Sequence, residues 1–223
     1  MPAAVIFDLD GILVDSEPVW AEVKREVALA HGGHWTDHAA TDMLGMNGPE
    51  WSRYLRDELG VQLDGLDIQR LVVDGVRERV AVAPPAIPGA HDAVVAIADR
   101  WPVGLASSAD RPVIMAILEA MEIADRFGVV VSAEEAGRGK PAPDVYLEAA
   151  RQLAVDPRDS VGIEDSGNGM RAVKAAGMAL IAIPNPGTPV LPDALALADV
   201  VLDTIADLTP DAVDRAARVR NPT

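Results

Sequence analysis

Three acidic residues follow an apolar run at the start of the chain, in a spacing suited to holding a cation. Residues 4–7 read as a buried strand, and Asp8, Asp10 and Asp15 come after it. Alternate residues of an extended segment point the same way, so Asp8 and Asp10 share a face. Two carboxylates so close repel one another, which raises the pKa of one or requires a cation between them. A solvated turn is the alternative, but three acidic residues after a fully apolar strand favour a functional site.

Further polar residues stand just beyond later apolar runs. They are Ser107, Lys140, Glu164 and Asp165. Ligands of an open parallel sheet bind at the carboxyl ends of its strands, so these side chains would converge with Asp8 and Asp10. Carboxylates, a hydroxyl and an ammonium suit a phosphate on a hard cation, because Mg²⁺ prefers oxygen ligands. Taken alone, Ser107 or Ser108 could simply cap the next helix, and Glu164 could start one.

The elements that must position these residues alternate between strands and helices. Apolar runs predict strands at 4–7, 103–106, 129–131, 160–163, 180–183 and 200–202. Helical periodicity predicts helices over 89–99, 111–121, 143–154, 167–176 and 210–219. This alternation indicates right-handed crossovers, and therefore an α/β fold with a Rossmann-like, doubly wound parallel sheet.

A block of helices interrupts this pattern. Residues 16–87 contain no convincing strand, and their apolar spacing predicts helices over 19–30, 39–44, 49–59 and 66–82. The strand at 4–7 has no partner inside the block, so it belongs to the later sheet. We therefore expect a core of residues 1–15 and 88–223, with a helical domain of residues 16–87 inserted after the first strand.

The composition narrows the class of protein and the kind of partner. The chain has 223 residues, of which 49% are hydrophobic and 24% charged, and this is ample for a core. Its net charge of −16 disfavours nucleic acid and anionic membranes as partners. No apolar run approaches the roughly 20 residues of a membrane span. Without cysteine or a signal-peptide pattern, we expect a cytoplasmic protein, and without heptads a monomer.

The ordered motifs resemble those of the haloacid dehalogenase (HAD) superfamily of aspartate-nucleophile phosphotransferases. Residues 8–17, Asp-Leu-Asp-Gly-Ile-Leu-Val-Asp-Ser-Glu, are similar to its first motif in the branch of small-molecule phosphatases and beta-phosphoglucomutase. Ser107 resembles the second motif, Lys140 within residues 137–144 the third, and residues 162–169 the fourth. The inserted helices stand where the family carries its helical C1 cap, so the resemblance covers nearly the whole chain.

The resemblance implies an Mg²⁺-dependent phosphatase that acts on a small phosphomonoester, such as a sugar phosphate. Asp8 would attack phosphorus and form an aspartyl-phosphate, with Asp10 as the acid and then the base. The phosphoryl group would contact Ser107 and Lys140. The metal ligands implied are Asp8, Asp10 through its backbone carbonyl, Asp165 and Glu164. Glu164 could instead lie just behind the ligands.

Other residues are expected to support this set. The residues that we place behind the direct contacts are Asp15, Ser108 and Ser166. In the helical domain, the loop 43–50 would set the choice of substrate. The substrate contacts expected there are Gly45, Asn47 and Arg53. The alternative for Arg53 is a solvated helix face.

Two other functions fit parts of the pattern. Beta-phosphoglucomutases usually carry an arginine just before the corresponding Leu-x-Gly, where this sequence has Asp42-Met43-Leu44-Gly45. Arg53 could hold a second phosphate from the next helix, so a phosphosugar mutase stays the alternative. Receiver domains of signalling proteins also pair a strand-end aspartate with Mg²⁺ and a lysine. They are shorter and lack the helical insertion, so a phosphatase is favoured.

Overall fold

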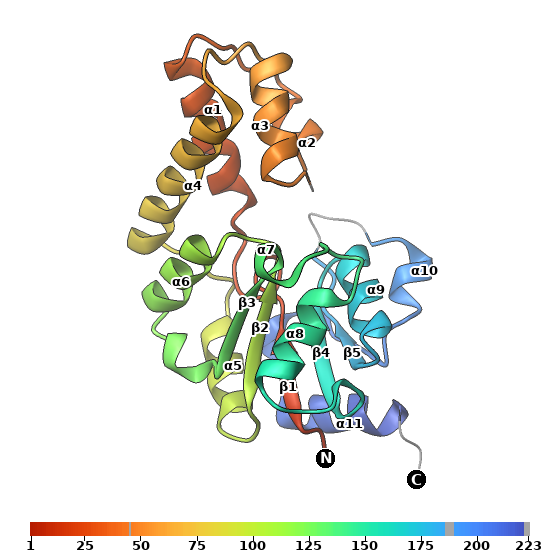
Figure 1. Ribbon diagram of the computed structural model, residues 1–223. Coiled ribbons are helices and arrows are strands. Elements are labelled where there is room, and N and C mark those ends of the chain that lie inside the picture. The colour runs from red at the N-terminus through yellow and green to blue at the C-terminus, as the bar shows by residue number, and fades with distance from the viewer. Residues whose placement is uncertain (45, 186–189, 221–223) are drawn as a thin grey trace. The chain divides into compact units, whose positions relative to one another are not determined.

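The computed structural model describes residues 1–44, 46–185 and 190–220, and the chain forms two compact units (Figure 1). The sheet unit consists of Met1–Asp15 and Pro84–Thr223, and the helical unit of Ser16–Ala83. The sequence predicted that the helical domain ends at residue 87, whereas in the structure the helical unit ends at Ala83. Residues 85–87 join the sheet unit because they pair with residues 13–15: Ile87 donates its N–H to Leu13 O over 2.9 Å.

Among the described residues, six parallel strands form one sheet in the order β3-β2-β1-β4-β5-β6. They are β1 (Ala4–Phe7), β2 (Val103–Ser107), β3 (Val129–Ser132), β4 (Ser160–Glu164), β5 (Ala179–Ala182) and β6 (Val200–Val201). At the centre, Val5 of β1 pairs with Val103 on one side and with Val161 on the other. The chain runs outward from β1 to β3 and then returns to β4, so the strand order reverses between β1 and β4. The predicted doubly wound α/β fold is confirmed.

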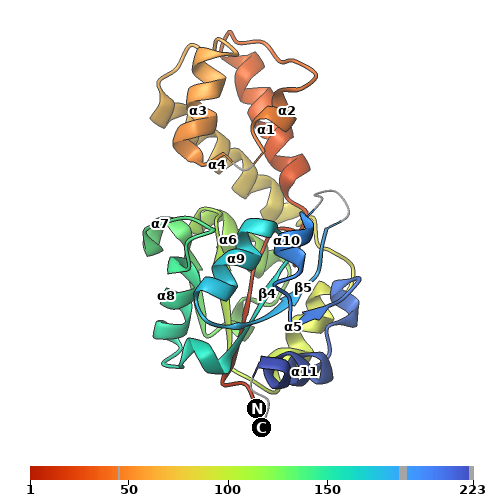
Figure 2. The same cartoon turned by 90° about the vertical axis from the view of Figure 1, so that its right-hand side faces the viewer.

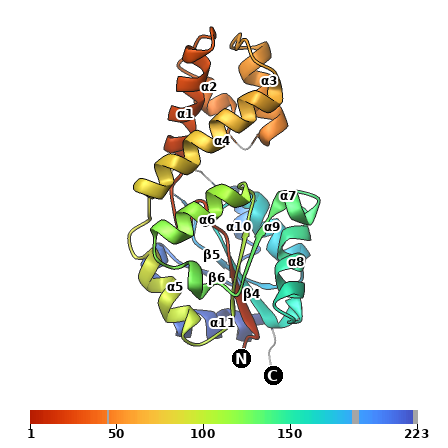
Figure 3. The ribbon, with the colours of Figure 1, turned by 60° about the vertical axis from the view of Figure 1, so that its left-hand side comes forward.

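Helices cover both faces of the sheet (Figures 2 and 3). One face carries α8 (Asp144–Gln152) and α9 (Gly167–Ala175), and the other carries α5 (Ala90–Ala98), α6 (Arg111–Ala120) and α11 (Pro210–Arg220). Because both faces are covered, β1, β2 and β5 are buried along their whole length, which explains their nearly continuous apolar runs. Tyr146 and Ala149 of α8 and Val173 of α9 belong to one core cluster with Ile6 and Leu180 of the sheet.

Some short elements were not predicted. They are α7 (Ala133–Ala136), α10 (Pro192–Leu195) and the 3₁₀ turns Ala124–Arg126, Pro157–Asp159 and Ile205–Asp207. Segments of three or four residues are too short to show a helical period, so local hydrogen bonds define them instead. Ser132 and Glu135, for example, form a capping box around the start of α7.

The described part of the helical unit consists of α1 (Glu17–Ala30), α2 (Ala39–Asp42), α3 (Gly48–Asp57) and α4 (Gly65–Val82). Both α1 and α3 pack against α4. The stripe that α4 buries consists of Ile68, Val72, Val76 and Val80. This spacing of four residues is the helical periodicity on which the prediction depended. No helix within residues 1–44, 46–185 and 190–220 combines the length and apolar character that a membrane span requires.

Candidate active site

Three strands deliver polar side chains to one edge of the sheet. Asp8 directly follows β1, Glu164 ends β4 and precedes Asp165, and Ser107 ends β2. These strands are parallel, so their carboxyl ends meet at the same edge. The N–H of Asp8 donates to Ile163 O over 3.0 Å, and this bond ties the end of β1 to the end of β4.

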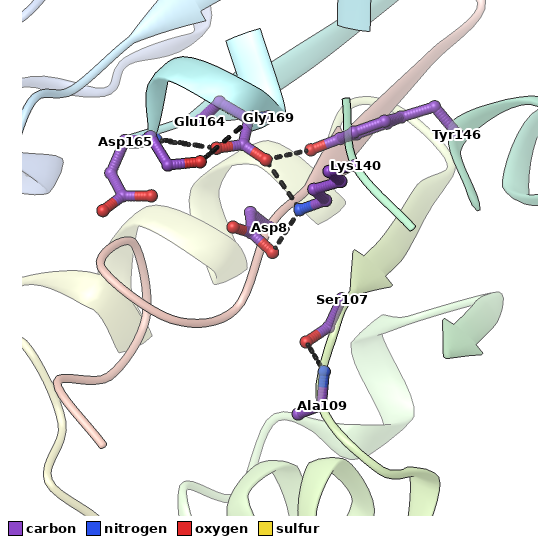
Figure 4. Close-up of polar contacts among 9 residues, drawn as sticks. Asp8, Ser107, Ala109, Lys140, Tyr146, Glu164, Asp165 and Gly169 are labelled. Atoms are coloured by element: carbon purple, nitrogen blue, oxygen red, sulfur yellow. Dashed lines mark hydrogen bonds and ion pairs between the residues drawn. The ribbon is translucent and has the colours of Figure 1, made fainter. Parts of the chain in front are cut away.

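Lys140 joins this edge from the loop between α7 and α8 (Figure 4). Its Nζ lies 2.8 Å from Asp8 Oδ1 and 2.6 Å from Glu164 Oε1, and its side chain is 7% exposed. Burial alone would lower the pKa of Lys140, but the carboxylates of Asp8 and Glu164 raise that pKa above its ordinary value. Lys140 is therefore a charged ammonium that bridges two carboxylates.

Asp8, Glu164 and Asp165 form a buried acidic cluster. One carboxylate oxygen from each lies within 4.8 Å of the others. Burial and the charge of Glu164 raise the pKa of Asp8 well above its ordinary value. The same two causes raise the pKa of Asp165 to about 7. Three carboxylates exceed the charge of one ammonium, so the cluster fits a hard divalent cation such as Mg²⁺.

Both carboxylate oxygens of Glu164 accept hydrogen bonds. Oε1 accepts from Lys140 Nζ over 2.6 Å and from the Tyr146 hydroxyl over 2.8 Å. Oε2 accepts from the N–H groups of Asp165 and Ser166, each over 3.1 Å, and from Ser166 Oγ over 3.0 Å. Burial opposes ionisation of Glu164, but the Lys140 ammonium and the other donors hold its pKa below the ordinary value. Glu164 is therefore a firmly held anion just before α9.

Two glycines allow the backbone to approach these carboxylates closely. A Cβ on Gly169, in the first turn of α9, would lie 1.8 Å from Glu164 Oε1. A Cβ on Gly11 would lie 2.0 Å from Asp165 Oδ2, and Gly11 also has a φ of +79°. A larger residue at either position would have to displace the acid beside it.

Asp10 and Ser107 complete the set of side chains expected at this edge of the sheet. Burial and Glu164 dominate the raised pKa of Asp165, and the charge of Asp10 adds to them, which places Asp10 in the neighbourhood. Ser107 is 1% exposed, and its Oγ accepts the N–H of Ala109 over 3.0 Å (Figure 4). This bond shapes the turn after β2 and leaves the hydroxyl proton of Ser107 for another acceptor.

The three residues placed behind the direct contacts differ in position. Ser166 donates to Glu164 and caps α9 by accepting the N–H of Gly169 over 3.1 Å. Asp15 is exposed at the end of the first loop, and Ser108 is exposed in the turn after β2. Asp110 occupies the N-cap position of α6, so the alternative role of Ser107 or Ser108 as that cap is wrong.

Tyr146 belongs to the cluster, although the sequence did not indicate it. It is fully buried in α8, and its hydroxyl donates to the same Glu164 oxygen that Lys140 contacts. Lys140 Nζ also lies 5.2 Å from the centroid of the Tyr146 ring. The apolar face of α8 predicts only that this aromatic residue is buried, so no sequence signal pointed to its hydroxyl.

A family model, that of the haloacid dehalogenase-like hydrolases, matches residues 2–177. The chain belongs to this family. The predicted resemblance is confirmed, and the protein is a hydrolase of the HAD-like class.

Individual relatives are similar to this hydrolase over most of its length. Hexitol phosphatase B of Escherichia coli (strain K12) is 34% identical over 225 residues, which cover 92% of this chain and 94% of that protein. Fructose-1-phosphate phosphatase YqaB of the same strain is 31% identical over 179 residues, 79% of this chain and 93% of that protein. The crystal structure of CbbY from Rhodobacter sphaeroides in complex with phosphate has a TM-score of 0.85 at 29% identity, covering 96% of this chain and 100% of that one.

The residues expected to contact substrate from the helical unit of this hydrolase are less distinctive. Gly45 lies outside the described residues. Asn47 caps α3 in a capping box: its Oδ1 accepts the N–H of Glu50 over 3.0 Å, and its own N–H donates to Glu50 Oε2 over 2.9 Å. Arg53 is exposed on α3. Asn47 therefore has a structural role in α3, and substrate contact by Asn47 and by Arg53 stays a prediction.

Proposed function

We propose that this hydrolase is an Mg²⁺-dependent phosphatase that hydrolyses a small phosphomonoester through an aspartyl-phosphate on Asp8. The observation that carries the proposal is the 2.8 Å contact between Asp8 Oδ1 and Lys140 Nζ in a buried cluster with Asp165. The names of the relatives, a hexitol phosphatase and a fructose-1-phosphate phosphatase, support an ester of the sugar-phosphate kind.

In this mechanism a carboxylate oxygen of Asp8 attacks phosphorus, and the ester P–O bond breaks. Asp10 gives a proton to the departing oxygen and then takes one from the water that attacks the aspartyl-phosphate. Lys140 stabilises the ionised form of Asp8 and the charge on the phosphoryl oxygens. The hydroxyl proton of Ser107 is available to a phosphoryl oxygen.

The cation would be held by carboxylate oxygens of Asp8 and Asp165 and by the backbone carbonyl of Asp10. When bound, Mg²⁺ neutralises negative charge on the attacking carboxylate and the phosphoryl group. The five hydrogen bonds to Glu164 favour a role in orienting Lys140 over direct contact with the ion. We assign the selection among phosphate esters to the helical unit, because the family resemblance implies that this unit serves as a cap.

Phosphate release from a panel of sugar and polyol phosphates tests the proposal. Mg²⁺ should support release, while EDTA, Asp8→Asn and Asp10→Asn should each abolish it. Asp203→Asn, a change of the same kind at an exposed position, should leave the rate unchanged. Release by Asp8→Asn at the wild-type rate would disprove the nucleophile. If no phosphate is released, but glucose 1-phosphate becomes glucose 6-phosphate after priming with a bisphosphate, the enzyme is a mutase.

A further inference from the structure

Tyr146 contacts the Lys140–Glu164 pair in two ways. Its hydroxyl donates to Glu164 Oε1 over 2.8 Å, and its ring centroid lies 5.2 Å from Lys140 Nζ (Figure 4). The residue is fully buried in α8 and belongs to the core cluster that includes Ala149 and Val173, so its ring has little freedom to move. One rigid side chain therefore contacts both members of an ion pair.

The hydroxyl of Tyr146 limits how closely Lys140 can associate with Glu164. A carboxylate oxygen has two lone pairs, and Oε1 of Glu164 uses them for the Lys140 ammonium and the Tyr146 hydroxyl. Its Oε2 is taken by donors at the start of α9. Glu164 therefore offers Lys140 one position only, and in that position Nζ also contacts Asp8 Oδ1 over 2.8 Å.

The ring of Tyr146 restricts the ammonium from a second direction. A cation is attracted to the face of an aromatic ring within about 6 Å of its centroid, and burial strengthens the attraction. The ammonium carries three N–H donors, and two of them serve Asp8 and Glu164. With these contacts made, the third N–H is available to an oxygen of a bound phosphoryl group.

We infer that Tyr146 is a positioning residue, which holds the Lys140 ammonium against Asp8 and in reach of the phosphoryl group by sharing Glu164 Oε1 and supplying a ring face. This inference depends on the proposed function for its catalytic consequence, but not for its effect on phosphate binding. Without the hydroxyl, Lys140 would gain the second lone pair of Oε1 and shift toward Glu164, away from Asp8.

The test is a double-mutant cycle between Tyr146→Phe and Lys140→Met. Tyr146→Phe keeps the ring and its packing and removes only the hydroxyl. We expect it to lower kcat/KM about tenfold in the wild-type background, mostly through kcat, and less than about twofold when Lys140 is already methionine. Tyr54→Phe is the matched control, because Tyr54 also donates its hydroxyl to a carboxylate, Asp42 Oδ2, over 2.7 Å. The control should keep wild-type kinetics.

A second readout does not depend on turnover. Calorimetric titration of each variant with inorganic phosphate in the presence of Mg²⁺ should show weaker binding for Tyr146→Phe, and no further weakening on top of Lys140→Met. If esters are not hydrolysed but phosphate binding by the four proteins of the double-mutant cycle follows this pattern, the proposed function fails and the role of Tyr146 stands. Equal losses in both backgrounds, or a Tyr146→Phe variant with a lower Tm but wild-type kinetics and phosphate binding, would show a merely structural role. Absence of both turnover and phosphate binding in the wild type would overturn both proposals.

Discussion

Lys140 Nζ lies 2.8 Å from Asp8 Oδ1, and the two side chains are 7% and 9% exposed. Charges interact far more strongly in such a site than in water, because little solvent screens them. The ammonium favours the ionised form of Asp8, while burial and Glu164 favour the protonated form. The reactivity of Asp8 therefore depends on the cations close to it, which are the Lys140 ammonium and, in the proposed mechanism, a bound Mg²⁺.

Replacing Lys140 with methionine should impair both catalysis and stability. The change removes the charge that bridges Asp8 and Glu164 and leaves two buried carboxylates facing one another. We expect kcat to fall by a factor of about 10² to 10³, which is the typical loss when one preorganised hydrogen-bond donor is removed from an active site. Unfolding in urea with EDTA should show a loss of roughly 3 kcal/mol. Lys174→Met, which breaks a 2.8 Å contact with Asp199, should leave kcat unchanged. Similar kcat losses in both variants would contradict the assignment.

Mg²⁺ should stabilise the wild-type protein, and Asp8→Asn should reduce that gain. The cluster holds three carboxylates against one ammonium, so a bound divalent cation relieves repulsion. At 100 times its Kd, a ligand adds about 2.7 kcal/mol to the free energy of unfolding. Differential scanning fluorimetry with Mg²⁺ or EDTA measures the shift in Tm. In EDTA, Asp8→Asn should melt above the wild type because it buries one charge fewer. An equal gain from Mg²⁺ in both proteins would place the ion elsewhere.

Gly169→Ala should be costly although alanine is the better helix former. The new Cβ would lie 1.8 Å from Glu164 Oε1, so either α9 or the carboxylate must move. We expect a loss of about 1–3 kcal/mol in the free energy of unfolding and a reduced kcat. Gly65→Ala in α4 is the control, because its nearest contact would be Ser52 Oγ at an ordinary 3.5 Å. If the two variants have the same stability in urea and the same rate of phosphate release, the close approach of Gly169 to Glu164 does not matter for function.

Asp110 should make stability depend on pH. Burial and the neighbouring Glu134 raise the pKa of Asp110 from 3.8 to about 6. The folded state therefore binds a proton more tightly than the unfolded state, and this contribution to stability is lost as the pH rises from about 4 through 6. Asp110→Asn should stabilise the protein at pH 7.5 by about 1 kcal/mol, a reduced figure because the carboxyl is only half-buried. At pH 4 the gain should vanish. Urea unfolding at both pH values measures it, and an equal gain at both would refute the shift.

The sequence predicted the strands and the acids well for a physical reason. A parallel strand covered on both faces needs an unbroken apolar run, so β1 and β5 are visible in the sequence, and the polar residue that ends each run marks the sheet edge. Glu164 and Asp8 were found in this way. The family resemblance was needed to single out Lys140, because a lysine in a loop has no such periodic signal.

Tyr146 could not be predicted, because its role depends on three-dimensional packing. The period of α8 shows that the residue faces inward, but the direction of its hydroxyl depends on where α8 lies against the sheet. The hydrogen bond from Ala109 to Ser107 and the pairing of residues 85–87 with residues 13–15 are equally hidden. Each depends on the local course of the backbone, and the spacing of apolar residues along the sequence does not reveal that course.

The central place of β1 has a consequence for how the protein is made. The strand is synthesised before the other strands of the sheet, and the residues that Val5 pairs with, Val103 and Val161, are synthesised much later. Pairing of segments so distant in sequence is entropically costly and slow, so β1 waits as an exposed apolar segment during synthesis. The edge of the sheet that carries Asp8 and Glu164 can therefore assemble only after β4 has emerged, and until then the unpaired strand is exposed to aggregation.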